Sequence, residues 1–163
     1  MIEAPVVWLR TELQRSVHGS AWHGPSLEEA LANVSFAQAV ARPIPGAHSI
    51  AELVHHVAGW MEEVRRRLDG AAPEMPARGD WPALPPGSDY EWTAWVNDVA
   101  AAALALDQAL AAFPVERLAD TVGEGAHDAP LGSGVTYAAM INGVIQHNVY
   151  HAGQILLLAR AAR

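Results

Sequence analysis

Two histidines near the end of the chain have a spacing that suits metal binding. In the stretch QHNVYHAGQI, residues 146–155, His147 and His151 are four positions apart. On an α-helix this spacing places both imidazoles on one face, one turn from each other. A neutral imidazole can bind a divalent cation through a ring nitrogen, and an imidazole that is buried needs a partner. The pair therefore indicates a metal site, although histidine pairs at this spacing also occur on solvated helix surfaces.

Helical periodicity predicts that this pair faces a protein core. Apolar residues of the same segment recur on one face of a helix. They are Met140, Ile141, Val144, Ile155 and Leu158. His151 falls inside this face, His147 lies at its edge, and Asn148 also points inward. The two imidazoles are thus expected to be buried, where a cation would satisfy both of them.

A third histidine comes from an earlier helical segment, HSIAELVHHVAGW, residues 48–60, which continues to residue 69. The apolar face of that helix consists of Ile50, Leu53, Val54, Val57, Met61, Val64 and Leu68. His56 lies at the border of this face, whereas His55 is expected to face solvent. A single inward histidine is more often a hydrogen-bonded core residue than a ligand. If a histidine of this helix reaches the interior, it is His56, and three nitrogens, with His147 and His151, suffice for an open metal site.

Other metal-dependent designs fit the sequence poorly. A zinc protease helix carries H-E-x-x-H with the glutamate as general base, and Asn148 stands in that place here. A di-iron bundle needs Glu-x-x-His pairs on two helices, and the segment 136–161 contains no glutamate. The chain has no cysteine, which excludes thiolate–zinc sites, disulfides and a cysteine nucleophile. No catalytic acid or base is identifiable from the residues.

Helix start signals define the elements that must position these histidines. Serine three residues before glutamate is typical of a capping box, and it occurs at 26–29, 49–52 and 88–91. We predict helices over about 4–17, briefly after residue 26, and over about 49–69, 88–113 and 136–161. The segment 71–88 contains five prolines and cannot be helical throughout, and 123–134 is rich in glycine. The pattern predicts an all-α domain with four main helices.

Length and composition narrow the function classes. The 163 residues fit a single domain over 1–163. A net charge of -8 argues against nucleic acid, because phosphate binding needs clustered lysine and arginine. No apolar stretch is long enough to cross a membrane, and the first residues lack the basic and apolar regions of a signal peptide. We therefore expect a soluble, cytoplasmic protein that uses neither a membrane nor a nucleic acid as partner.

The two histidine-bearing segments together resemble the DinB/YfiT-like superfamily. One family pattern, Ser-hydrophobe-x-Glu-hydrophobe-x-x-His, corresponds to Ser49, Ile50, Glu52, Leu53 and His56. The other, His-x-x-x-His-x-Gly-Gln, corresponds to His147, His151, Gly153 and Gln154. AWHGPSLEEAL at 21–31 and GQILLLARAA at 153–162 are similar to one subgroup of the family. The resemblance thus extends over most of the chain.

This resemblance implies a fold, a cofactor and a range of functions. The fold would be a four-helix bundle with up-down-down-up topology and long crossover connections. His56, His147 and His151 would hold one divalent metal ion, Zn²⁺ or Ni²⁺, in a protein that forms homodimers. The function would be that of a metal-dependent hydrolase or a thiol transferase, with a small-molecule substrate such as a low-molecular-weight thiol. The alternative is a non-catalytic, metal-stabilised binding or stress-related module.

Several further residues are candidates for supporting the site. Glu52 can accept a hydrogen bond from His56, although its place in a capping box offers a simpler role. Asn148, Tyr150 and Gln154 are possible hydrogen-bonding partners of the ligands. His48 lies just before a helix start, where it could line the mouth of the site or be a solvated loop residue. Trp81 lies in a connecting segment, where it could cover a pocket or a subunit contact. Gly153, inside a helix, suggests close approach of another helix.

Overall fold

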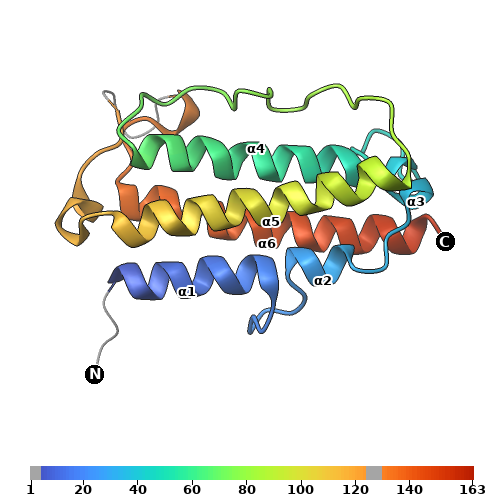
Figure 1. Ribbon diagram of the computed structural model, residues 1–163, viewed down its shortest axis with the longest axis horizontal. Helices are drawn as coiled ribbons and strands as arrows, with labels where there is room; N and C mark the ends of the chain where they lie inside the picture. The colour runs from blue at the N-terminus through green and yellow to red at the C-terminus, as the bar shows by residue number, and fades with distance from the viewer. Residues whose placement is uncertain (1–4, 124–129) are drawn as a thin grey trace.

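The computed structural model describes residues 5–123 and 130–163 (Figure 1). In these ranges the α-helices are α1 (Pro5–His18), α2 (Leu27–Leu31), α3 (Phe36–Val40), α4 (Ile50–Leu68), α5 (Asp89–Ala112) and α6 (Tyr137–Ala161). Two short 3₁₀ helices, η1 (Val115–Ala119) and η2 (Pro130–Gly132), lie between α5 and α6. The all-α prediction is confirmed, and the four long helices match the predicted ranges to within about two residues. Residue 4, where we placed the first helix start, lies outside the described ranges.

The four long helices form a bundle. Figure 1 shows α1 and α6 running in one direction and α4 and α5 in the opposite one, which is an up-down-down-up topology. α4 packs against both α5 and α6, and α1 packs against the same two helices. Because α4 and α5 are parallel neighbours, the chain must return along the whole bundle between them. Residues 69–88 make this return over the outer side of α4.

Side-chain caps account for most helix starts, with one correction. Ser26 and Ser49 form complete capping boxes with Glu29 and Glu52, as predicted. The predicted third box is not formed, because the Ser88 hydroxyl accepts from the Tyr90 amide and donates to the Glu91 carboxylate instead. α3 was not predicted at all. Its capping box pairs Ser35 with a glutamine, Gln38, whereas the predicted boxes all pair serine with glutamate.

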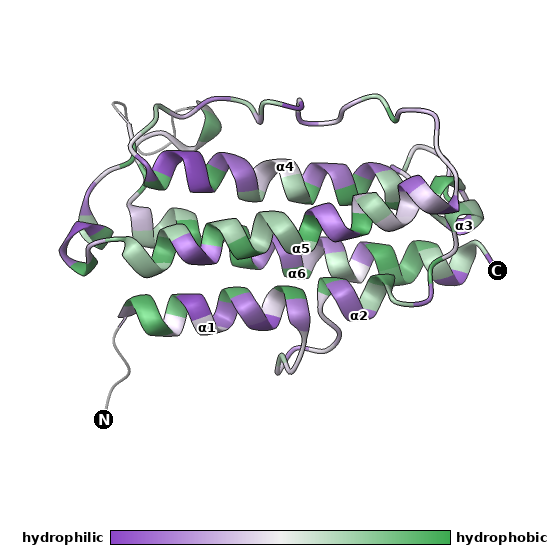
Figure 2. Ribbon diagram, in the orientation of Figure 1, coloured by the Kyte–Doolittle hydropathy of each residue, from purple (hydrophilic) through white to green (hydrophobic). Residues whose placement is uncertain are grey.

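The core lies between the four long helices. Figure 2 shows that apolar residues dominate α5 and α6, whereas α4 carries both hydrophobic and hydrophilic residues. Every long helix contributes side chains with no exposed surface, among them Leu13, Val57, Leu106, Ile141 and Ile155. Burial of such apolar surface is the main favourable contribution to folding. In the described part of the chain, no helix is both long enough and apolar enough to cross a membrane.

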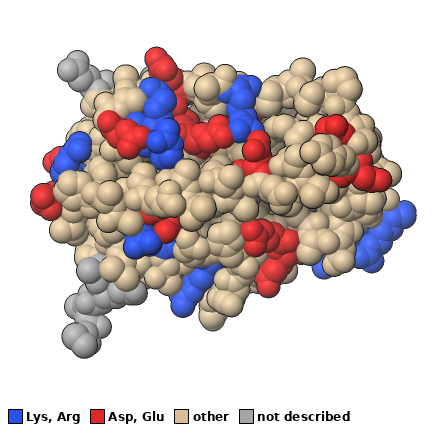
Figure 3. All heavy atoms as spheres, in the orientation of Figure 1, with Lys and Arg blue, Asp and Glu red and all other residues tan. Residues whose placement is uncertain are grey.

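Ion pairs fasten the 71–88 segment to α4. Glu63, on α4, is 3 % exposed and accepts hydrogen bonds from Arg66, from Arg67 and from the backbone amide of Glu74, at 2.8 to 3.1 Å. Arg78 pairs with Glu62 farther along the same segment. Figure 3 shows basic and acidic side chains next to one another on this face. These contacts hold the 71–88 segment on α4, and residues 80 and 81 of this segment contact His56.

Candidate metal centre

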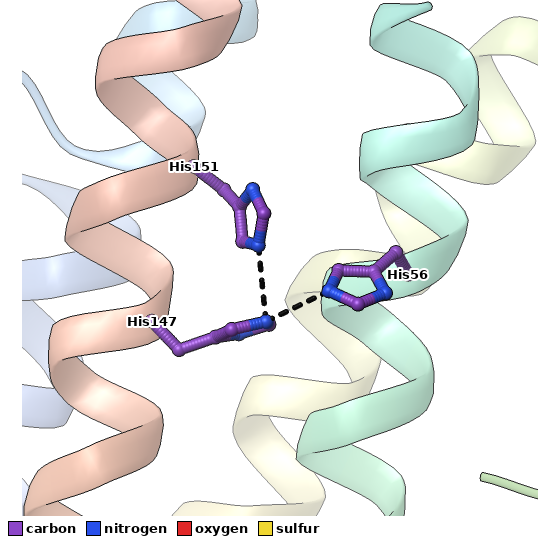
Figure 4. A group of neighbouring side chains, drawn as sticks. All are labelled: His56, His147 and His151. Atoms are coloured by element: carbon purple, nitrogen blue, oxygen red, sulfur yellow. Dashed lines mark hydrogen bonds between the residues drawn. The ribbon is translucent and has the colours of Figure 1, made fainter. Parts of the chain in front are cut away.

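Three imidazole rings converge between α4 and α6 (Figure 4). His56 extends from α4, and His147 and His151 extend from successive turns of α6. Nε2 of His147 lies 2.9 Å from Nε2 of His56 and 3.0 Å from Nε2 of His151. One ligand atom from each ring lies within 4.8 Å of the others, so the group could hold a metal ion. All three sequence-predicted candidates are thus brought together.

Hydrogen bonds at the far side of two rings fix their protonation. Nδ1 of His56 donates to the backbone carbonyl of Asp80 at 2.8 Å, and Nδ1 of His151 donates to Oε1 of Gln154 at 2.6 Å. Each neutral ring has one N–H, so Nε2 of both rings presents a lone pair. Both lone pairs face His147 Nε2, which can carry one proton at most. A cation that accepts a lone pair from each ring resolves this shortage of donors, so the residues fit a divalent metal.

The surroundings keep the rings neutral. Burial, reinforced by repulsion from His151 and His56, lowers the pKa of His147 to about 3. Burial also lowers the pKa of His151 to about 4, and the hydrogen bond that His151 donates to Gln154 opposes this shift. The pKa of His56 is lowered by burial too, with Asp80 opposing the shift. Metal binding at neutral pH therefore requires no proton release from any of the three histidines.

Residues 80 and 81 cover the His56 side of the cluster. Asp80 Oδ1 accepts from Trp60 Nε1 at 2.8 Å, which ties the segment to α4. The Trp81 indole stacks on His56 with a centroid distance of 3.9 Å and an interplanar angle of 2°. On its other face it stacks on His48 at 3.6 Å. His48 and Trp81 therefore both line the site, although they remain partly open to solvent, with Trp81 37 % exposed and the His48 side chain 41 % exposed.

A cavity of about 300 Å³ opens beside the cluster. His151, Trp81 and His48 form part of its wall, and Tyr150 and Gln154 extend it along α6. Because a buried histidine of the cluster borders this cavity, a small molecule in it would lie next to the position of a bound cation.

The supporting residues proposed from the sequence have mixed outcomes. Gln154 accepts a hydrogen bond from His151, as the sequence suggested. Glu52 has the capping role and pairs with Arg42, so the acceptor for His56 is Asp80 instead. Asn148 is buried as predicted, but its amide donates to Ser16 rather than to a histidine ring.

Three other expectations are settled by burial and packing. His55 does not simply face solvent, because its ring packs on Trp95 of α5 at 5.0 Å and its Nε2 is buried. Tyr150 is 64 % exposed and lies at the cavity mouth. No described atom would come within 4 Å of a Cβ at Gly153, so no neighbouring helix of this chain explains that glycine.

Comparison with known proteins identifies one family. The model described as the DinB superfamily matches residues 21–155, a range that contains all three clustered histidines and Asp80. No curated protein and no solved structure matches the chain significantly.

Proposed function

The chain belongs to the DinB superfamily, and on that premise we propose that it is a metal-dependent enzyme acting on a small molecule. The reaction is hydrolysis or the transfer of a low-molecular-weight thiol. One observation carries this proposal: three imidazole Nε2 atoms face one another between α4 and α6, beside an open cavity. Catalytic metal sites commonly have three protein ligands and leave a position free for substrate.

His56, His147 and His151 would hold one divalent cation. Imidazole is a ligand of intermediate softness and suits Zn²⁺ and Ni²⁺, the two ions that we propose. When bound, such a cation supplies Lewis-acid chemistry, by which it polarises a carbonyl group or lowers the pKa of a thiol or a water molecule.

The other residues of the site orient the ligands and limit access of water. The Asp80 carbonyl and the Gln154 side chain hold His56 and His151 in the tautomers whose Nε2 lone pairs face the centre. Trp81 covers one face of His56, so substrate approach is directed to the cavity that borders His151. No proton-transfer residue is assigned.

A non-catalytic, metal-stabilised binding module is the alternative. A cation with a purely structural role is usually coordinated by four protein ligands, which leave no open position. The cluster found among the described residues offers three, all histidines. The carboxylate of Asp80 lies 3.2 Å from Nδ1 of His56, whereas Nε2 of His56 faces the cluster centre. This carboxylate therefore lies on the side of the ring that faces away from the cluster. These features favour the enzyme.

We also propose a homodimer as the working form and, because the net charge is -8, a partner other than nucleic acid. We propose that the protein acts in the cytoplasm. Sedimentation of the purified chain at several concentrations tests the dimer, and a monomer at micromolar concentration would contradict it.

Cobalt binding provides the first test of the metal site. The metal-free protein is titrated with Co²⁺ and followed by visible absorption, and we expect one ion per chain. Replacing His56, His147 or His151 by asparagine should weaken binding strongly. His23→Asn is the matched control, because His23 is an exposed histidine outside the cluster. Equal binding by all four variants would exclude this site.

Turnover decides between the enzyme and the module. Protein loaded with Zn²⁺ or Ni²⁺ is assayed with simple esters, amides and thiol adducts, alongside the His151→Asn variant. Activity that depends on both metal and His151 supports the enzyme. Stoichiometric metal binding without turnover across the panel would favour the non-catalytic module.

A further inference from the structure

The cavity beside the histidine cluster has a mainly apolar wall. Aliphatic and aromatic side chains form most of it: Ile44, Leu53, Trp81, Tyr150, Leu157 and Leu158. Among the described residues that line it, none is an aspartate, glutamate, lysine or arginine. Its volume of about 300 Å³ is at the lower end of the range for small-molecule sites, roughly 300–1,000 Å³.

The polar groups of the cavity are concentrated near the metal ligands. His151 and Gln154 contact each other through the hydrogen bond between Nδ1 and Oε1. His48 is held against Trp81 by stacking. The opening carries the aliphatic side chain of Leu157, which is 58 % exposed, and the ring of Tyr150, which is 64 % exposed and packs on His151 with a centroid distance of 5.1 Å. A molecule that fills this cavity would meet polar groups at one end and hydrocarbon along its remaining length.

The nearest charged groups are already paired. Arg42 contacts Glu52 at 2.6 Å, and the same carboxylate accepts from the Ser49 amide at 2.7 Å. A charged group in the body of a ligand, away from the histidine cluster, would therefore lose its hydration without gaining a free counter-ion from the described residues that line the cavity.

We propose that this cavity binds a small, uncharged, mainly apolar molecule whose polar head faces the histidine cluster. The inference rests on the proposed function, because it takes the cavity as the substrate site of the metal centre. It narrows the substrate class to molecules with an aliphatic or aromatic body. A thiol that carries carboxylate or ammonium groups in its body fits this wall poorly.

A homologous series of linear amides tests the proposal on the full-length chain. Binding of butanamide, hexanamide and octanamide is measured by calorimetry, with and without Zn²⁺. Each added methylene should tighten binding roughly fourfold until the cavity is filled, as expected from about 0.8 kcal/mol per buried methylene. Alkanoates and alkylammonium ions of equal length, measured on the metal-free protein, should bind at least tenfold more weakly than the amides.

Two exposed leucines provide a matched pair of variants. Leu157→Glu places a charge at the cavity mouth, whereas Leu104→Glu places one on α5, away from the cavity. The two leucines are 58 % and 53 % exposed, so both variants should fold. Octanamide binding should weaken at least fivefold in Leu157→Glu and stay within twofold in Leu104→Glu.

The outcomes separate this inference from the metal proposal. Absence of amide binding with and without Zn²⁺, equal binding of charged analogues, no chain-length dependence, or equal effects of the two variants would each overturn the apolar-substrate inference. Cobalt titration of the same samples reports on the metal site independently. Amide binding without cobalt binding would overturn the proposed function while leaving the ligand class of the cavity intact.

Discussion

The Nδ1 atom of His56 donates to the backbone carbonyl of Asp80 at 2.8 Å, which links a candidate metal ligand on α4 to the 71–88 segment. The side chain of Asp80 strengthens this link, because it accepts from Trp60 on the same helix. A residue 24 positions away in the sequence therefore controls the orientation and the tautomer of His56. Partners of this kind tune metal affinity in known metalloproteins.

Replacing the Asp80 side chain should weaken metal binding. In Asp80→Ala, Trp60 loses its acceptor and the carbonyl that holds His56 is less firmly placed. We expect affinity for Zn²⁺ to fall by about ten- to a hundredfold, measured by competition with a chromophoric chelator. Asp69→Ala removes an exposed carboxylate that pairs with Arg65 and serves as control. If both variants bind Zn²⁺ like the wild type, Asp80 does not position the ligand.

Gln154 should contribute to the site through His151. Gln154→Ala removes the acceptor of the His151 Nδ1 proton, so the ring is free to rotate or to change tautomer. Zn²⁺ affinity should fall by about tenfold, and Gln154→Glu, which keeps an acceptor, should restore it. Gln146→Ala, on the exposed face of the same helix, should leave affinity unchanged. A loss in Gln154→Glu as large as in Gln154→Ala would argue against this role.

Helical periodicity explains why the ligands were predictable and some of their partners were not. His56, His147 and His151 lie on regular helices, where spacing alone determines which face a residue occupies. Gln154 follows the same rule, being three residues after His151. Asp80 lies in a proline-rich segment without periodicity, and its position depends on tertiary ion pairs such as Arg78 with Glu62.

The errors in the fold prediction have local causes. α3 was missed because it is only five residues long and its capping box pairs Ser35 with glutamine, Gln38, whereas the predicted boxes all used glutamate. At Ser88 the sequence pattern was present, but the hydroxyl instead accepts from the second amide of the helix. His55 was assigned to solvent from the periodicity of α4 alone. The sequence could not show that α5 passes close enough for Trp95 to cover its ring.

The metal-free protein should lose stability as pH falls below about 6.5. Folding lowers the pKa of His147 to about 3 and of His151 to about 4, so the unfolded chain binds more protons between these values and 6.5. This stability is fully present above pH 6.5. Below pH 6.5, each of these two histidines lowers the free energy of unfolding by up to about 1.4 kcal/mol for every pH unit.

Urea unfolding between pH 7.5 and 4.5 measures this effect. The part of this window above about pH 5.5 lies clear of the ordinary carboxyl pKa values, so histidines dominate the change there. The His147→Asn variant lacks one of the titrating rings and should show a shallower decline. A stability that stays flat down to pH 4.5 in the wild type would contradict the burial of neutral imidazoles.

The buried ion pair at Glu63 should be worth far more than a surface pair. Burial alone would raise the pKa of Glu63, but hydrogen bonds from Arg66, the Glu74 amide and Arg67 lower it below its usual value. Glu63→Ala leaves Arg67, which is 3 % exposed, without its carboxylate, and should cost about 3–5 kcal/mol. Asp69→Ala breaks the exposed pair with Arg65 and should cost less than about 1 kcal/mol. Urea unfolding at pH 7.5 compares them, and equal losses would mean that Glu63 does not fasten the 71–88 segment.

Trp81 and Trp22 offer a direct comparison of a buttressing and a solvated tryptophan. The Trp81 ring lies between His48 and His56, with centroid distances of 3.6 and 3.9 Å, whereas Trp22 is fully exposed. Aromatic pairs contribute about 0.5–1.5 kcal/mol each, so Trp81→Ala should destabilise the protein by about 1–3 kcal/mol. Trp22→Ala should stay within about 0.5 kcal/mol of the wild type. Because the loss arises from stacking, Trp81→Phe should recover much of the stability. Thermal or urea unfolding compares the variants. Equal midpoints for Trp81→Ala and Trp22→Ala would show that the Trp81 ring does not hold the 71–88 segment over the histidines.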